Sequence, residues 1–247
     1  MEPMEQRFEA ARAMLVDRER PQNGIGTLGE KTLHAVLKYT FEPDAACHEQ
    51  KVGSFVADIH NNDGITEIQT RGFTPLRRKL KYFLPLFPVH VVFPVAAAKY
   101  LRWIDPETGE TTPRRKSPKQ TPLCEATFEF IRILDCIGHE NLRLTIVLLD
   151  VEETRVITGQ NRFGKKASTR VERIPLRWVR TVELRTKEDY LQLLPEKLPE
   201  EFTLNDLKKA AKINQKRAQT ALQFLRKLDI VENCGKTGRQ LLYRKKI

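Results

Sequence analysis

The pattern of hydrophobic and polar positions along residues 29–95 predicts a helix, three strands, a second helix and a further strand. Apolar side chains that recur every three or four positions indicate the helices, and a period of two or an unbroken apolar run indicates the strands. The last strand, 89–93, is almost entirely apolar, which is typical of a strand buried on both faces. A helix near 125–137 and a strand near 143–151 are expected beyond it. The first six elements are predicted at 29–41, 47–52, 54–60, 65–70, 76–87 and 89–93.

A hairpin is expected between the second and third strands, because Asn61-Asn62-Asp63-Gly64 is a strong turn signal. Side chains alternate along a strand, and directly opposed residues share a face. A loop of any even length therefore puts Asp58, Glu67 and Gln69 on one face, whereas an odd loop or a bulge separates them. Two carboxylates held together without a basic neighbour repel each other and tend to bind a divalent cation.

A third carboxylate, Glu30, lies three residues before Leu33, on the apolar stripe of the first predicted helix. A carboxylate that faces a core needs a partner or a metal. A glutamate in the first helical turn is also favoured by the helix dipole alone. The local pattern leaves both interpretations open.

The C-terminal part, from residue 203 on, has the pattern of two helices followed by a hairpin. Thr203 and Asp206 form a capping-box start for the first helix. A break at 212–214 precedes a second helix with an apolar face, and a strand, a turn at 234–238 and another strand follow. The Pro/Glu stretch before it indicates a linker, so two domains are predicted, 1–195 and 200–247.

Positive charge is concentrated in this C-terminal part. The chain has a formal net charge of +11, and residues 203–247 hold 12 Lys or Arg against 3 Asp or Glu, a net +9. A compact basic domain is typical of a nucleic-acid binder, although a solvated cationic surface or an acidic protein partner gives the same pattern. Two further basic stretches, 114–119 and 162–177, are expected as loops or hairpins that touch phosphate or lie on the surface.

Several classes of protein are excluded or disfavoured by composition. The chain of 247 residues is 40% hydrophobic and 30% charged, which excludes a mostly disordered protein. Its longest apolar run, 83–98, is interrupted by three prolines, and its first residues are acidic where a signal peptide is basic. Four scattered cysteines form neither a disulfide scaffold nor a zinc motif. We therefore expect a cytoplasmic (intracellular) protein without a membrane partner.

The order of elements, with Asp58 near the end of the second strand and Glu67-Ile68-Gln69 on the third, resembles the PD-(D/E)xK nuclease superfamily in a variant with glutamine for the motif lysine. The resemblance implies an α/β (α+β) fold with a restriction-endonuclease-like αβββαβ core and a mixed sheet. Asp58, Glu67 and the Ile68 carbonyl would bind Mg²⁺ or Mn²⁺. Glu30 would complete that site, and Gln69 would orient the attacking water. The residues that spell the family motif letter by letter are Pro43-Asp44 and Glu49-Gln50-Lys51. We reject this match because Pro43-Asp44 follows a helix and because Asp44 and Glu49 are too close together in the sequence.

The two helices and hairpin at the C-terminus resemble a winged helix, in which the second helix of the pair usually enters the major groove. The resemblance implies that Gln215, Lys216, Arg217, Gln219 and Thr220 face DNA and that Lys236 and Arg239 touch phosphate. Winged helices also serve as protein-docking modules. Six further basic residues are candidates for DNA contact, namely Arg77, Arg78, Arg114, Arg115, Lys165 and Lys166.

The sequence thus predicts a metal-dependent DNA endonuclease that a winged-helix tail targets to its substrate. The alternative is a non-catalytic DNA-binding regulator or scaffold that keeps a degenerate nuclease fold, because Gln69 lacks the positive charge of the motif lysine. The structure of the nucleic-acid substrate, RNA included, and the oligomeric state, with a homodimer as one option, stay open.

Overall fold

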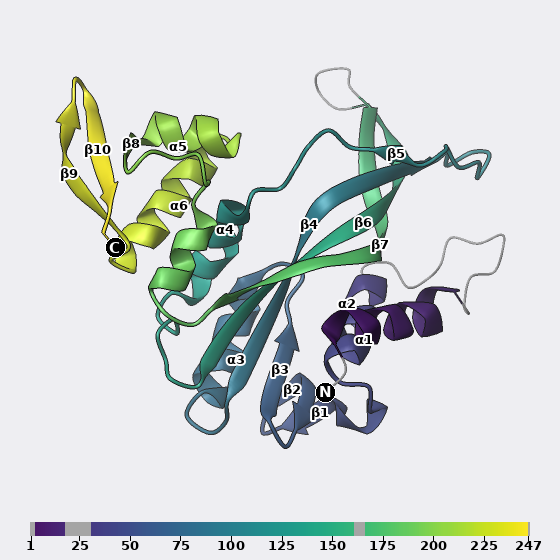
Figure 1. The fold of residues 1–247 in the computed structure, drawn as a ribbon. Helices are drawn as coiled ribbons and strands as arrows, with labels where there is room; N and C mark the ends of the chain where they lie inside the picture. Colours follow the sequence, from purple (N-terminus) through teal and green to yellow (C-terminus); the bar gives the residue numbers. More distant parts are fainter. Residues whose placement is uncertain (1–2, 18–30, 161–165, 247) are drawn as a thin grey trace. The chain divides into compact units, whose positions relative to one another are not determined.

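The computed structural model describes residues 3–17, 31–160 and 166–246 (Figure 1). The helices are α1 (Met4–Arg12), α2 (Lys31–Phe41), α3 (Phe73–Phe83), α4 (Thr127–Phe130), α5 (Leu204–Ala211) and α6 (Gln215–Lys227). The strands are β1 (His48–Val52), β2 (Phe55–Asn61), β3 (Gly64–Ile68), β4 (Val89–Ile104), β5 (Arg115–Lys116), β6 (Leu142–Gln160), β7 (Lys166–Leu184), β8 (Glu201–Thr203), β9 (Val231–Thr237) and β10 (Gln240–Lys245). Shorter helical turns of 3-10 or π type lie at Ala13–Asp17, Ala45–Cys47, Leu123–Ala126, Ile131–Ile133 and Glu188–Leu193.

The strands form a mixed sheet of seven and a small sheet of three. The large sheet has the order β1-β2-β3-β4-β6-β7, with β5 paired to β4, and the small one has the order β8-β10-β9. β3 runs parallel to β4, whereas β1 pairs antiparallel with β2 and β5 antiparallel with β4. The expected mixed α/β class with a mixed sheet is therefore confirmed.

The chain divides into two compact units, each built from three separate segments. Unit 1 comprises Met1–Asn61, Ala96–Gln120 and Val147–Arg180, and unit 2 comprises Asn62–Val95, Thr121–Ile146 and Thr181–Ile247. The strands β4, β6 and β7 each have residues in both units. The domain boundary expected between 195 and 200 stays a prediction.

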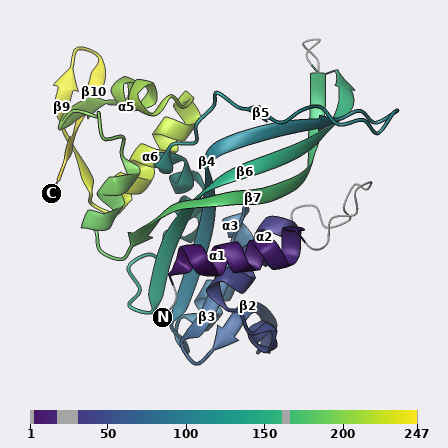
Figure 2. The ribbon, with the colours of Figure 1, turned by 45° about the vertical axis from the view of Figure 1, so that its right-hand side comes forward.

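In unit 1, α1 and α2 lie side by side (Figures 1 and 2) and bury apolar side chains against β7. The predicted stripe of α2 is buried, with Leu33 and Thr40 at 1% and 0% exposure. The Trp178 ring on β7 lies 5.6 Å from the Phe8 ring and 6.4 Å from the Phe41 ring, centroid to centroid. The helix predicted over 29–41 is confirmed for the part that the structure describes.

In unit 2, an aromatic cluster connects α3 to the C-terminal helices. The Phe73 ring lies 5.3 Å from Phe93 and 5.5 Å from Phe130, and the Phe130 ring lies 6.3 Å from Phe224 on α6. All but Phe93 are fully buried, and such ring pairs contribute free energy beyond the apolar area that they remove from water. The C-terminal helices thus pack on the helical turn at 127–130.

Several elements have boundaries other than those expected, among them α3, which was expected at 76–87. β4 extends well past the expected strand 89–93, and β6 extends past 143–151. The basic stretch beginning at 162 lies in β7 from Lys166 on, where Arg170 and Arg173 stay in a strand because Glu153 of β6 compensates their charge, at 3.7 and 3.8 Å. The helix expected near 125–137 is present in part, as α4 flanked by the 3-10 turns Leu123–Ala126 and Ile131–Ile133.

Among the helices in the described ranges, none combines the length and the apolar composition that crossing a membrane requires.

Burial makes one histidine of β4 a source of pH-dependent stability. Burial, with help from Arg143 and Arg185, lowers the pKa of His90 from 6.5 to about 3, and its Nε2 forms a 2.7 Å hydrogen bond with the Thr145 hydroxyl. His90 therefore stays neutral in the folded protein at pH values where the unfolded chain takes up a proton. The stability that the protein gains from keeping His90 neutral is fully present above the pKa of this histidine in the unfolded chain. That stability is lost as the pH falls from 6.5 toward 3.

We predict that His90→Gln, which keeps a hydrogen-bonding group and does not titrate, flattens the acid limb of the stability profile. The wild type should lose about 1.4 kcal/mol per pH unit more than the variant below pH ~6. Urea unfolding at pH 7, 5.5 and 4 measures this, with the exposed His139→Gln as control. Parallel losses in the wild type and His90→Gln would contradict the assignment.

Candidate functional site

The strand that carries the predicted acidic residue Glu67 is held in a parallel pair with β4. Ile65 N–H donates to the Pro88 carbonyl, and Gln69 N–H donates to the Val92 carbonyl, each at 2.9 Å. Gly64 begins this strand at φ +116°, and a Cβ there would lie 2.3 Å from the Pro88 oxygen. Only glycine fits so close an approach, so Gly64 sets the position of β3 against β4 and with it the place of Glu67.

Glu67 is a buried carboxylate with a lysine partner. Its side chain is 2% exposed, and Lys79 Nζ on α3 donates to both of its oxygens, at 2.8 and 3.0 Å. A buried carboxylate without a compensating charge is strongly unfavourable, so this ion pair with Lys79 stabilises the position of Glu67 inside unit 2. The sequence did not predict a role for Lys79. The only signal for it is its place next to the buried Leu80 on the face of α3 that packs inward, and many lysines flank an apolar stripe.

Gln69, expected to orient a water molecule, is bonded to the main chain through its amide nitrogen. Its Nε2 donates to the carbonyl of Arg71 and, at 3.2 Å, to the carbonyl of Gly72. These two bonds close the turn that leads into α3. In this arrangement the amide nitrogen of Gln69 stabilises the turn. The amide oxygen is the part of the side chain that can accept a hydrogen bond from water.

Asp58 lies in unit 1, next to a histidine of α2. His34 Nε2 and Asp58 Oδ2 are 3.1 Å apart, and their side chains are 27% and 15% exposed. The neighbours Ala57 and Ile59 are buried, as the predicted alternation requires. A role for His34 was not predicted either. The sequence shows that His34 follows the apolar stripe residue Leu33, but it does not show which strand α2 packs against.

The structure therefore brings Asp58 together with His34 in unit 1, and Glu67 together with Lys79 in unit 2. Ile68, whose carbonyl was expected to join them, is buried at 2% exposure. Glu30 lies outside the described residues. Within residues 3–17, 31–160 and 166–246, no three His, Cys, Asp or Glu side chains form a group that could hold a metal.

The basic face of α3 is partly neutralised. Arg77 donates two hydrogen bonds, of 2.8 and 2.7 Å, to the Asp135 carboxylate, and Lys81 Nζ lies 3.0 Å from it. The Arg77 hydrogen bonds hold the pKa of Asp135 well below its ordinary value. Arg78 is exposed on the same helix.

The C-terminal helices begin at capped positions, which fixes the orientation of α6. The Thr203–Asp206 capping box is present, and the Asn214 side chain accepts from Arg217 N–H at 2.9 Å. Of the residues expected to face DNA, five are exposed, and they are Gln215, Lys216, Gln219, Lys236 and Arg239.

Two residues of α6 have partners inside the protein. The Arg217 guanidinium lies 3.9 Å from the Phe128 ring centroid and 3.8 Å from Glu125, and the Thr220 hydroxyl donates to the Lys216 carbonyl at 3.0 Å. Arg217 therefore helps to attach α6 to the turn at 123–130, which is a structural role that the helical pattern does not reveal.

The basic residues of unit 1 that were expected to contact DNA also differ in whether they have partners inside the protein. Arg114 lies over the Tyr100 ring and 3.8 Å from Glu152, whereas Arg115 is exposed in β5. Lys166 begins β7, and its side chain, like the whole of Lys165, lies outside the described residues.

A buried acidic residue surrounded by arginines was not anticipated. The Glu153 side chain is 3% exposed and lies within ion-pairing distance of Arg155, Arg170 and Arg173. Burial alone raises the pKa of Glu153, but Lys99, Arg155 and Arg173 outweigh it, so the pKa is lowered. Glu153 thus compensates part of the positive charge that Arg155, Arg170 and Arg173 bring to β6 and β7.

Comparison with known proteins gives one family and one relative. A family model described as a domain of unknown function (DUF8091) matches residues 31–185, which include His34, Asp58, Glu67 and Lys79. A protein of Treponema pallidum (strain Nichols), described as an uncharacterized protein, is 35% identical over 222 residues, which are 90% of this chain and 87% of that protein. No solved structure matches the chain.

We predict that Lys79→Met lowers the free energy of unfolding by about 3 kcal/mol or more, because it leaves Glu67 buried without its cation. The double variant Lys79→Met/Glu67→Gln should recover much of that loss, since it removes the charge as well. Urea unfolding measures both. Lys81→Met, which removes the 57%-exposed partner of Asp135 from the same helix, should change stability by less than about 1 kcal/mol. Equal effects of Lys79→Met and Lys81→Met would show that burial does not govern the pair.

Proposed function

Since the chain belongs to the family of DUF8091, a domain of unknown function, we propose its function from its own residues: a divalent-metal-dependent DNA endonuclease whose C-terminal helices bind the DNA. The observation that carries the proposal is the sequence pattern, in which Asp58 lies on β2 and Glu67 on β3, the next strand along the chain. The connection between the strands is the two-residue turn Asn62-Asp63. Side-chain alternation over a connection of even length is the sequence argument for assigning both carboxylates to one metal site.

The donor atoms of these residues fit the proposed metal. Carboxylate and main-chain carbonyl oxygens are the ligands that Mg²⁺ prefers, and Asp58, Glu67 and the Ile68 carbonyl offer them. When bound, the metal supplies a Lewis acid that lowers the pKa of a coordinated water and stabilises charge on the phosphate. His34 and Lys79 already partner the two carboxylates, so in this proposal metal binding competes with these contacts.

Lys79 gives the site a positive charge that Gln69 cannot supply. Its Nζ is held against Glu67, and its side chain remains 26% exposed. An ammonium group in such a place can donate hydrogen bonds to a phosphate oxygen or to the attacking water. We therefore propose Lys79 as the cationic residue of the site, with Gln69 shaping the turn before α3.

The C-terminal part supports DNA binding through its exposed charge. We propose that β8–β10, α5 and α6 form a winged helix in which α6 enters the major groove and the β9–β10 hairpin touches phosphate. Lys216 on α6 and Lys236 and Arg239 on the hairpin are exposed. Contacts of this kind supply affinity that falls steeply with salt.

A second candidate function rests on the same ion pair. Lys79 compensates the charge of Glu67, and the Gln69 amide is bonded to the main chain, an arrangement in which the carboxylates stabilise the fold. In that case the chain is a non-catalytic DNA-binding regulator or scaffold.

We predict metal-dependent cleavage by the wild-type protein in an assay with plasmid, linear, single-stranded and branched DNA, each with Mg²⁺, Mn²⁺ or EDTA. Asp58→Asn and Glu67→Gln should each lower the rate by at least about 100-fold, because each removes a metal ligand. The exposed Glu107→Gln is the matched control and should cleave like the wild type. No cleavage of any substrate, with DNA binding retained, would favour the non-catalytic function.

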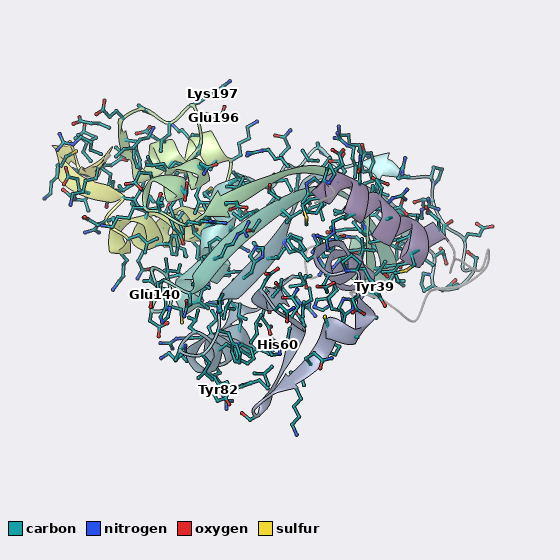
Figure 3. All side chains as sticks on the ribbon, turned by 60° about the horizontal axis from the view of Figure 1, so that its bottom comes forward. Tyr39, His60, Tyr82, Glu140, Glu196 and Lys197 are labelled. Atoms are coloured by element: carbon teal, nitrogen blue, oxygen red, sulfur yellow. The ribbon has the colours of Figure 1, made fainter. Side chains whose placement is uncertain are left out.

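A second prediction concerns the salt dependence of DNA binding. The double variant Lys216→Gln/Arg239→Gln should bind duplex DNA more weakly and reduce the slope of log K against log salt by about 1.8, roughly 0.9 for each phosphate that is no longer neutralised. Lys197→Gln, whose exposed side chain projects outward in Figure 3, is the control. Fluorescence anisotropy between about 50 and 200 mM salt measures the slopes. An unchanged slope in the double variant would exclude these residues from the interface.

A further inference from the structure

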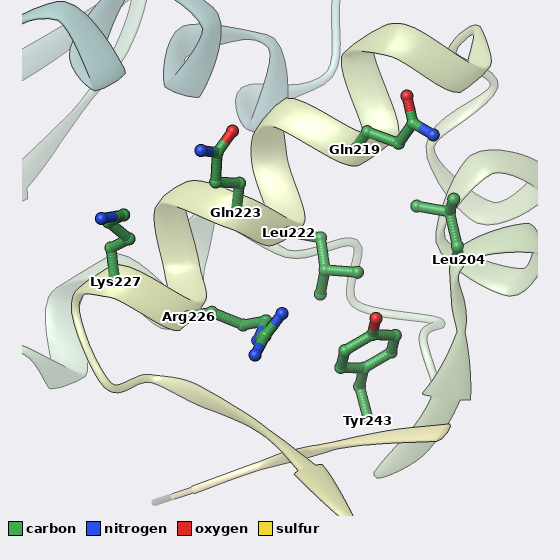
Figure 4. Close-up of a pocket in the computed structure, with 7 residues that line it drawn as sticks. All are labelled: Leu204, Gln219, Leu222, Gln223, Arg226, Lys227 and Tyr243. Carbon is green, nitrogen blue, oxygen red and sulfur yellow. The ribbon is translucent and has the colours of Figure 1, made fainter. Parts of the chain in front are cut away.

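Unit 2 contains a groove between α6, the start of α5 and β10 that the proposed nuclease does not use (Figure 4). Its volume is about 540 Å³, within the range of pockets that bind small organic ligands. Its walls are apolar where Leu204 and Leu222 meet it, and Gln219 and Gln223 lie one turn apart on α6 beside it. We call this the α6 groove.

The α6 groove carries positive charge that the protein does not compensate. Arg226 and Lys227 line it, and no acidic residue does. Both are exposed, and among the described residues neither has a carboxylate within ion-pairing distance. The Arg226 guanidinium lies 5.8 Å from the Tyr243 ring centroid and faces the same space (Figure 4). This differs from Arg217 on the same helix, whose charge is matched by Glu125.

Tyr243 adds a polar group that is directed into the groove. The residue is 5% exposed, and its hydroxyl points toward the space beside Leu222 (Figure 4). Among the described residues the hydroxyl has no hydrogen-bond partner. A phenolic hydroxyl can both donate and accept a hydrogen bond, and the buried ring holds it in place, so the groove offers this group to a ligand.

We propose that the α6 groove binds a nucleoside phosphate, either as a free nucleotide or as one nucleotide of a single strand. Arg226 and Lys227 bind the phosphate, for which the planar fork of an arginine is well suited. The base lies against Leu204 and Leu222, and the amides of Gln219 and Gln223 bond its edge. A base needs both an apolar contact on its face and hydrogen bonds at its edge, and this groove combines the two.

This binding uses other charged residues than duplex recognition by α6, and Gln219 is the residue that the two proposals share. The residues proposed to enter the major groove, such as Gln215 and Lys216, lie in the first turn of α6, whereas Arg226 and Lys227 lie in the last turn. The inference goes beyond the proposed nuclease, and it is measured without cleavage.

The test is calorimetric titration of the full chain, in EDTA, with each of the common nucleoside 5′-monophosphates. Adenosine, which lacks the phosphate, and inorganic phosphate, which lacks the nucleoside, are the control ligands. We expect at least one nucleotide to bind with a Kd below about 1 mM, and both control ligands to bind at least ~10-fold more weakly. Phosphate binding as tight as the nucleotide, or no nucleotide binding, would overturn the proposal.

Variants locate the binding in the groove. Arg226→Gln removes one charge-assisted contact and should raise the Kd about 10-fold, and Tyr243→Phe should raise it several-fold. Lys197→Gln, outside the groove, should leave it unchanged. Thermal unfolding checks that each variant is folded. If Arg226→Gln and Tyr243→Phe bind like the wild type, the groove is not the site.

A ten-residue oligothymidylate separates the two sources of the ligand. Oligothymidylate binding that thymidine 5′-monophosphate competes away, and that Arg226→Gln weakens, identifies a nucleotide of a strand. If Arg226→Gln weakens the binding of the nucleotide but leaves the binding of oligothymidylate unchanged, the ligand of the groove is a free nucleotide. Either of these two outcomes supports the proposal. Displacement of the nucleotide by an acidic, leucine-containing peptide at lower concentration than by other nucleotides would instead identify a protein partner and overturn it.

Discussion

The buried ion pair between Glu67 and Lys79 is the constraint on which the centre of unit 2 depends. It joins β3 to α3, and Gly64 allows β3 to approach the Pro88 carbonyl and pair with β4. α3 in turn begins at Phe73, whose ring belongs to the cluster that reaches α6 through Phe130. A single close backbone approach and a single compensated charge therefore position the candidate acidic residue and the packing of the C-terminal helices together.

The positive charge of the chain falls into two classes that do different work. In the β6–β7 ribbon and on α3, arginines such as Arg173 and Arg77 are matched by Glu153 and Asp135 and stabilise the fold. In the C-terminal part, Lys216 and Arg226 are exposed and without a carboxylate partner among the described residues. A net charge alone does not distinguish these classes. Only the uncompensated cations can attract a polyanion without breaking an internal contact. The proposed binding of DNA and of a nucleotide therefore rests on α6 and the β9–β10 hairpin.

Local pattern was sufficient for the elements and insufficient for the partners. The stripe of α2, the alternation of β2 and a hairpin turn within 61–64 follow from periodicity and turn chemistry, and each was predicted. The contacts of Asp58 with His34 and of Glu67 with Lys79 join residues 24 and 12 positions apart. They depend on how helices pack on strands, which no local spacing encodes. The length of β4 and β7 was missed for a related reason, since charged strand residues are stable only when a neighbouring strand compensates them.

The two candidate functions make opposite demands on Lys79. In a scaffold, Lys79 is a permanent counterion, and the site is most stable when nothing competes for Glu67. In a nuclease, Glu67 must bind both the Lys79 ammonium group and a metal. The ion pair with Lys79 must therefore be able to open when the metal binds. The geometry is compatible with sharing, because Lys79 keeps 26% of its side chain exposed whereas Glu67 keeps 2%. The lysine has solvent into which it can move, and the carboxylate does not, so any exchange of partners at this site begins with Lys79.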